Sequence, residues 1–521
     1  MTNPSTLYRG GVLHCPADPS ATALLVSGGR IAWLGTDGDA PPADRVVDLD
    51  GALVTPAFVD AHVHATDTGL ALSGLELSGV RSAGQLLDAV AGFAAGLPAD
   101  AVVLGHGWDE SGWSDATLPD AAALDRAAGG RRVYLSQASI HSALVSSALL
   151  AACPQAAQAA GYDASGWLRR DAHHVVRAAA QGSVTRAQRV AAQRVALAHA
   201  ASLGIAAVHE CGGPEISDEE DFTGLLGISG AGVPEVYGYW GELGGAARAR
   251  ELGAVGAGGD LFADGALGSR TAHVSQPYGD GDGCGHGYLS AEQVRDHLLD
   301  CAAQGLQGGF HAIGDAAIGT VLDGFAAAAA TLGVERLRAA RHRIEHAEIM
   351  NKRMIARFVE YGIVASMQPA FDRLWGGAGR MYEARLGLDR SLESNPMGAM
   401  HSVGVALAFG SDSPVTPLDP WGSVRAAAAH HNPAQRMSVR AAFAAHTRGG
   451  WRAVHLDVEG VLALGAPATF AVWSTPAGVE RGLPVLVAED PEVRGPDDPT
   501  PLPVCRRLVL RGEVIYEEGS S

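Results

Sequence analysis

Histidines at the ends of apolar runs are the residues of this chain best suited to metal chemistry. His62 and His64 lie two positions apart in the run FVDAHVHA. Side chains at positions i and i+2 of a β-strand share one face, so both imidazoles should point the same way and could hold one cation. A His-x-His pair often arises by chance, so further ligands are needed before it indicates a metal site.

Three later strand-like runs supply such ligands. His311 ends GGFH, His346 ends RIEH, and Asp412 follows VALAFGS. Taken singly, each histidine is more typical of a packed or surface side chain, and Asp412 of a helix N-cap or turn. Taken together, four imidazoles and one carboxylate suit Zn²⁺ or a similar divalent ion that keeps one coordination position open for water. The pattern predicts a divalent metal centre.

A repeated unit between these residues predicts the elements that carry them. An amphipathic helix ends at a glycine and an apolar strand follows, as in AHAASLG-IAAVHE and FVEYG-IVASMQP, where Gly362 should end the helix in a left-handed conformation. Such units favour parallel strands with crossover helices, hence an α/β fold of the (β/α)8 TIM-like barrel type. A doubly wound open sheet is the main alternative. Against it, no GxGxxG follows a first strand.

The two ends of the chain resemble each other and differ from the middle. ALLVSGGRIAWLG and RRLVLRGEVIYEE both read as β-hairpins, turning at Gly28-Gly29 and Arg511-Gly512. Neither hairpin could bury its apolar face alone. We therefore expect residues 1–55 and 456–521 to form one small discontinuous β-sandwich, with the barrel in residues 56–455.

Residues 66–190 do not follow the repeated pattern of helix, glycine and strand. We therefore expect this stretch to be an inserted lid or subdomain. Trp108 and His141 lie within this insertion and are candidate substrate-binding residues. The alternative is a stabilising subdomain whose tryptophans are core residues.

The amino-acid composition limits the classes of molecule that this protein is expected to bind. The 521 residues include 57 acidic and 38 basic ones, a net charge of −19 that disfavours nucleic acid and anionic membrane surfaces. No signal peptide or membrane span is evident, and the six cysteines are widely spaced, without a CxxC pair. These features favour a cytoplasmic protein that acts on a small molecule. The sequence does not determine the oligomeric state, and a homodimer is the assembly that we retain as a hypothesis.

The order His-x-His, His, His, Asp on a barrel with a discontinuous β-domain resembles the amidohydrolase superfamily. FADGALGSRTA, FHAIGDAAI, RIEHAEI and GSDSPVTPLDPW are similar to its YtcJ-like branch, and the likeness runs through nearly the whole chain. The resemblance implies a metal-dependent hydrolase that cleaves a C–N bond in an amide, formamide, cyclic amide or amidine. It does not imply a particular substrate.

The chain departs from this family at one position. Many relatives carry a lysine that becomes carboxylated and bridges two metals, and here GDLFADG places Asp260 there. Because an aspartate is shorter than a lysine carbamate, we expect one ion, most simply Zn²⁺, with two ions as the alternative. Asp260 is kept as a further candidate ligand, and Glu210 is a second candidate for the bridge.

The resemblance and the metal together suggest roles for individual side chains. Asp412 would take a proton from an activated water and return it to the leaving nitrogen, while His346 stabilises the oxyanion. Arg270 is the candidate for holding a substrate anion, with a structural salt bridge as its alternative. An isomerase, lyase or decarboxylase on the same scaffold and a non-catalytic binding protein remain the rival functions.

Overall fold

The computed structural model describes residues 4–519 except 114, 116, 140, 489–494 and 496. They form two compact units, which are described separately. The first contains the chain before Thr66 and after Ala196, and the second is Thr66–Ala196.

An eight-stranded parallel sheet forms the centre of the first unit. Its strands, in spatial order, are β7 (Phe58–Val63), β13 (Ile205–Gly212), β14 (Glu235–Trp240), β15 (Gly256–Ala257), β16 (Gln307–Ala312), β17 (Arg343–His346), β18 (Val364–Met367) and β19 (Ala406–Phe409). The chain beyond β19 closes the ring, because Val63 pairs with Ser413 and the Asp412 N–H donates to the His62 carbonyl at 2.8 Å. The predicted barrel is confirmed, and the open sheet is excluded.

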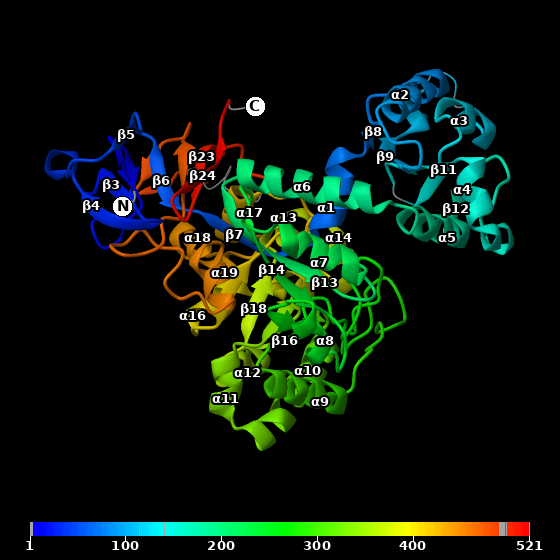
Figure 1. Cartoon of the computed structure of the whole chain (residues 1–521). Coiled ribbons are helices and arrows are strands. Elements are labelled where there is room, and N and C mark those ends of the chain that lie inside the picture. Colours follow the sequence, from blue (N-terminus) through cyan, green and yellow to red (C-terminus); the bar gives the residue numbers. More distant parts are fainter. Residues whose placement is uncertain are drawn as a thin grey trace. The chain divides into compact units, whose positions relative to one another are not determined.

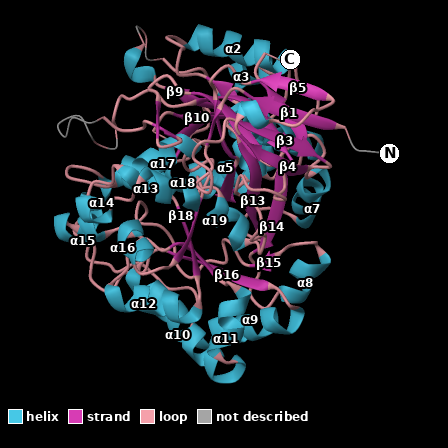
Figure 2. Ribbon diagram, turned by 90° about the vertical axis from the view of Figure 1, so that its left-hand side faces the viewer, coloured by secondary structure: helices cyan, strands magenta, loops and turns pink. Residues whose placement is uncertain are grey.

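Helices lie outside these strands (Figure 2). They are α7 (Glu219–Ile228), α8 (Ala246–Glu251), α9 (Ala291–Gln304), α10 (Asp315–Leu332), α11 (Val334–Ala340), α12 (Lys352–Tyr361), α13 (Pro369–Trp375), α14 (Met381–Leu386), α15 (Leu388–Glu393), α16 (Met397–Ser402), α17 (Pro420–Ala428), α18 (Val439–Ala445) and α19 (Arg448–Ala453). Helix α12 buries Ile355 and Phe358 and, as predicted, ends at Gly362, whose φ is 65°. By length and composition alone α10 could cross a membrane, but here it buries Val321 and Phe325 against the barrel.

Strands from both ends of the chain form a two-sheet β-domain in the same unit (Figure 1). One sheet has the order β4 (Arg30–Gly35), β3 (Ala23–Ser27), β1 (Ser5–Arg9), β5 (Arg45–Asp48), and the other β2 (Val12–Leu13), β6 (Leu53–Pro56), β20 (Phe470–Ser474), β23 (Val504–Leu510), β24 (Glu513–Glu517). Residues of both sheets, including Leu24, Val54 and Phe470, share one buried cluster. Both predicted hairpins are present, and the discontinuous β-sandwich is confirmed. A separate pair, β21 (Val479–Glu480) and β22 (Leu483–Pro484), lies outside the two sheets.

The second unit has a sheet of its own. Its order is β12 (Trp167–Arg169), β11 (Ser142–Val145), β10 (Val133–Gln137), β9 (Val103–Trp108), β8 (Leu75–Glu76). Neighbouring residues of β10 pack into different cores: Leu135 joins helices α2 (Ala83–Ala95) and α3 (Ala121–Ala127), and Tyr134 joins α4 (Ser147–Ala152) and α5 (Arg170–Gln181). Two helices cross the boundary between the units in sequence, α1 (Ala65–Ser73) and α6 (Arg186–Ser202). Whether this unit acts as a lid stays a prediction.

Candidate metal centre

The end of β7 carries the first two imidazoles. His62 is fully buried and His64, just beyond the strand, is nearly so, with their ring centroids 5.4 Å apart. Asp412 comes from the chain that closes the barrel, and its Oδ1 lies 3.3 Å from His64 Nε2 and 3.5 Å from His62 Nε2. These three side chains converge, as the sequence predicts.

The other two imidazoles come from the neighbouring strands β16 and β17. The rings of His311 and His346 lie 4.4 Å apart. Strand alternation would point His346 away from Glu345 and the barrel interior. A positive φ of 70° at His346 turns its ring inward instead, and Gln368 Oε1 holds its Nδ1 at 2.8 Å. Such backbone geometry costs free energy and is concentrated at functional sites.

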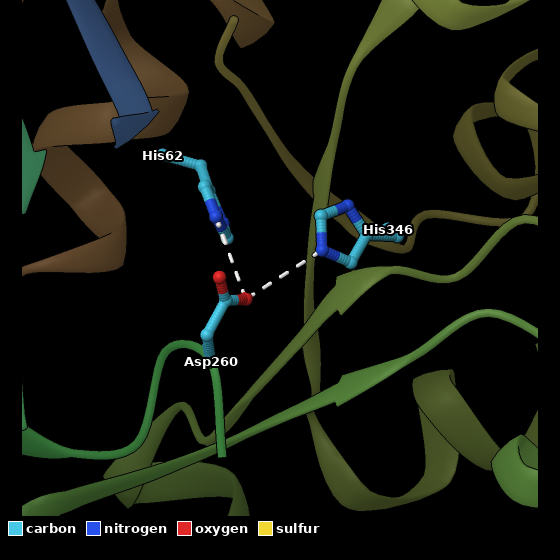
Figure 3. Close-up of side chains that lie close together, drawn as sticks. All are labelled: His62, Asp260 and His346. Carbon is cyan, nitrogen blue, oxygen red and sulfur yellow. Dashed lines mark ion pairs between the residues drawn. The ribbon is translucent and has the colours of Figure 1, made fainter. Parts of the chain in front are cut away.

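Asp260 lies among all four imidazoles. Its Oδ1 is 3.5 Å from His62 Nε2, 3.4 Å from His311 Nδ1 and 3.6 Å from His346 Nε2. Its Oδ2 is 3.2 Å from His64 Nε2. Figure 3 shows the carboxylate between His62 and His346. Asp260 therefore reaches the centre, in agreement with its place among the candidate ligands.

The path of the backbone, rather than the length of the side chain, brings the Asp260 carboxylate to the centre. Ala257 pairs with Gly308, whereas Phe262 pairs with His311, so the segment carrying Asp260 has more residues than β16 opposite it and must bulge. Gly258 makes this bulge feasible, because a Cβ there would lie 2.2 Å from the Gly309 nitrogen. The glycines of GAGGD were the signal that the sequence argument overlooked.

The donor set fits divalent metal. Nε2 of His62 and Nε2 of His346 are both buried and, among the described residues, lack a hydrogen-bond partner. Three triads among the described residues have ligand atoms within 4.8 Å of one another, and two of them consist of His and Asp alone: His62, His64, Asp412 and His62, Asp260, His346. Burial raises the pKa of Asp260, but the imidazoles of His62, His311 and His346 hold it well below its usual value. A carboxylate shared between imidazole groups matches the bridge of a two-ion site.

Two charged residues of β17, which sequence reasoning missed, support the centre from inside the barrel. Glu345 Oε2 lies 3.0 Å from His62 Nδ1, and Arg343 donates to both Glu345 oxygens at 2.9 and 2.8 Å. Arg343 also donates to His209 Nδ1 at 2.8 Å, and its guanidinium lies 4.3 Å from the Tyr239 ring centroid. Charged residues at alternate positions of a buried strand, in RIEH, were the available signal.

Glu210, the second candidate for the bridge, does not lie among the four imidazoles. Its Oε2 accepts a hydrogen bond from the Ala65 N–H at 2.7 Å, where α1 begins. It belongs to neither His/Asp triad of the centre. Of the two candidates, Asp260 is the one that lies among the four imidazoles.

A cavity of about 300 Å³ opens beside the centre. Five of the proposed metal ligands reach its wall: His64, Asp260, His311, His346 and Asp412. The rest of the wall is mainly apolar and includes Phe262, Leu267, Ile313, Phe371, Trp375 and Val415. Glu348 and Tyr382 complete its polar part. The cavity can take a small, mostly apolar molecule.

Arg270 lies in the same unit as this cavity but does not line it. The Arg270 guanidinium binds both oxygens of Asp280, at 2.9 and 2.8 Å, which is the alternative structural role. Trp108 is fully buried in the core of the second unit, and its indole N–H donates to the Leu135 carbonyl. A side chain without exposed surface cannot contact a substrate in this conformation, so Trp108 is corrected to a core residue. His141 is exposed in the second unit.

Comparison with known proteins agrees with the residue pattern. Residues 45–516 match the model of the amidohydrolase family. The chain is 27% identical over 277 residues to YtcJ of Bacillus subtilis (strain 168), named as an amidohydrolase, covering 50% of this chain and 47% of the relative. It is 34% identical over 225 residues to Protein LONG AFTER FAR-RED 3 of Arabidopsis thaliana, covering 41% and 38%. The matched part thus spans less than half of each of these relatives.

The fold also matches a solved structure. An uncharacterized metal-dependent hydrolase from Pyrococcus furiosus superposes with a TM-score of 0.75 at 24% identity, covering 90% of this chain and 98% of that one. With the family match over most of its length, the chain belongs to the amidohydrolase family.

Proposed function

We propose that this protein is a metal-dependent hydrolase that cleaves a C–N bond in a small, largely apolar molecule. One observation carries the proposal: the Asp260 carboxylate lies among four imidazoles at the wall of a cavity of about 300 Å³. Family membership supports hydrolysis, and the apolar wall supports the kind of substrate.

The ligands divide into two groups that share Asp260. His62, His64 and Asp412 would hold one divalent ion, and His311 and His346 a second, most simply Zn²⁺ in both positions. Such ions supply an acidic water and polarise the substrate carbonyl. We therefore propose two ions, in place of the single ion that the short aspartate side chain led us to expect.

The side chains of the protein carry out the proton transfers. Asp412 lies at the cavity wall, where its carboxylate can accept a proton from water and return it to the leaving nitrogen. Gln368 holds the His346 ring in place through Nδ1, so Nε2 keeps a fixed orientation toward Asp260 and the second ion position. Phe371 stacks on the His346 ring at 6.0 Å and helps to exclude bulk water.

Turnover of a substrate panel tests the proposal. Protein reconstituted with Zn²⁺, Mn²⁺, Fe²⁺ or Co²⁺ would be assayed with N-formyl, N-acyl and cyclic amides of aromatic amines. In ¹⁸O-labelled water, hydrolysis of an acyclic amide places one labelled oxygen in the acid product. Conversion without solvent oxygen would identify an isomerase, lyase or decarboxylase instead. Failure of every metal-loaded form across the panel would count against the C–N assignment.

A further inference from the structure

A buried carboxylate in the cavity wall takes no part in the reaction described above. Glu348 follows β17, is only 2% exposed and lines the same cavity as Asp260 and His346. Its Oε2 accepts a hydrogen bond from the hydroxyl of Tyr382, a residue of α14 that is itself 1% exposed. The main chain is anchored as well, because the Asn395 N–H donates to the Glu348 carbonyl at 2.8 Å.

Among the described residues, no permanently charged cation lies in the cavity wall beside this carboxylate. The residues that line the cavity include neither lysine nor arginine. A buried carboxylate that lacks a cationic partner is costly, and a ligand that brings a cation or several N–H donors would remove that cost.

Aromatic side chains lie close to Tyr382, the partner of Glu348. The Trp375 ring centroid is 6.2 Å from that of Tyr382 and 4.6 Å from that of Phe371. Met381, next to Tyr382, also reaches the cavity wall. A planar apolar group fits this surface, and a cationic group attached to it could reach Glu348.

We propose that Glu348 is a specificity-determining residue that selects substrates with a positively charged N–H-bearing group, such as an amidinium or guanidinium, on an aromatic or branched apolar body. This inference rests on the proposed function, because it assumes that the cavity is the substrate site. Arg270 led us to expect a negatively charged group on the substrate, whereas Glu348 predicts a positively charged one. Arg270 is paired with Asp280 and does not line the cavity. A substrate carboxylate near Glu348 would instead be repelled.

Binding of two isosteric probes to the metal-loaded protein tests the inference without requiring turnover. Benzamidinium carries the cation, and acetophenone is its neutral isostere that cannot be hydrolysed. Isothermal titration calorimetry should show benzamidinium binding at least about tenfold more tightly, as expected of a charge-assisted hydrogen bond. In Glu348→Gln, which keeps size and shape, this preference should fall to about twofold or less.

Met381→Leu provides the matched control. It changes the apolar wall next to Tyr382 without changing charge, so it should alter both affinities by a similar factor and leave their ratio intact. Equal affinities in the wild-type protein, or a preference retained in Glu348→Gln, would overturn the inference. If the preference is observed but no amide is hydrolysed, the assignment of Glu348 stands and the proposed reaction fails.

Discussion

His62 Nδ1 lies 3.0 Å from Glu345 Oε2, so that the other ring nitrogen of His62 faces Asp260. The Glu345 carboxylate is therefore placed to fix the tautomer and orientation of a metal-binding imidazole. Burial would raise the pKa of Glu345, but Arg343 and His62 hold it well below its usual value, so the group is anionic.

Glu345→Gln should weaken metal binding about 10- to 100-fold, because the ring loses its charged hydrogen-bond partner. Stability should also fall, by about 3–5 kcal/mol, because the Arg343 cation stays buried without its carboxylate. Metal affinity would be measured by competition with a chelator well below the melting temperature. Ser366→Ala, which removes another Arg343 partner at 3.0 Å, should lower stability slightly and leave affinity unchanged. Equal losses of affinity in both variants would contradict the positioning role.

Asp260→Asn should lower the metal content from two ions per chain to one, since a neutral amide bridges two cations poorly. Elemental analysis of dialysed protein and anomalous scattering at the metal edge measure this directly. Glu210→Gln is the matched control and should retain two ions, because Glu210 binds the Ala65 N–H rather than the centre. Full double occupancy in Asp260→Asn would show that another group forms the bridge.

Gly258→Ala should disturb the bulge that carries Asp260, because the added Cβ would lie 2.2 Å from the Gly309 backbone nitrogen. We expect a loss of stability of about 1–3 kcal/mol and weaker binding of one of the two ions. Chemical denaturation and metal titration measure the two effects. Gly224→Ala, in α7 with open space around the new methyl group, should cost nothing. Normal binding of both ions in Gly258→Ala would show that the bulge does not require glycine.

Asp412→Asn should lower kcat by about 10²- to 10⁴-fold and change KM much less, because the amide cannot accept the proton from water. The comparison needs equal metal content in both proteins, confirmed by elemental analysis. A fully loaded variant with near-normal turnover would remove Asp412 from the role of base.

His342 should make stability depend on pH. Burial lowers its pKa to about 3, and its Nδ1 accepts the Gly308 N–H at 2.8 Å. The unfolded chain, with a histidine pKa of about 6.5, binds the proton first, so stability is complete above that pH and decreases as pH falls toward 3. The expected slope is up to about 1.4 kcal/mol per pH unit. Urea unfolding at pH 7, 6 and 5 should show a smaller slope in His342→Gln at the same metal load, and an unchanged slope in the exposed control His401→Gln.

The sequence predicted those ligands whose positions follow from strand ends. His62, His64, His311 and Asp412 required only the order of parallel strands and the side-chain period of two. Asp260 was a candidate ligand, but its place among the imidazoles depends on a backbone bulge that side-chain length does not reveal. The inward turn of His346 depends on a single backbone angle, which residue type does not reveal.

Side-chain partners were harder to predict than positions. Arg270 could bind a substrate or an acidic neighbour, and only the fold shows Asp280 within reach. Trp108 could line a site or fill a core, and the second unit places it in its core. Glu348 was overlooked because a glutamate beyond a strand end has no distinguishing pattern.

The pairing of β6 with β20 has a consequence for synthesis on the ribosome. The Trp473 indole donates a hydrogen bond to the Thr55 hydroxyl, across 418 positions of the chain. At roughly 5–20 residues per second, the N-terminal strands wait about 20–80 s before their partners have been made. During that interval β6 has an unpaired apolar edge, open to other nascent chains. The time spent translating the barrel thus sets how long this edge stays unpaired.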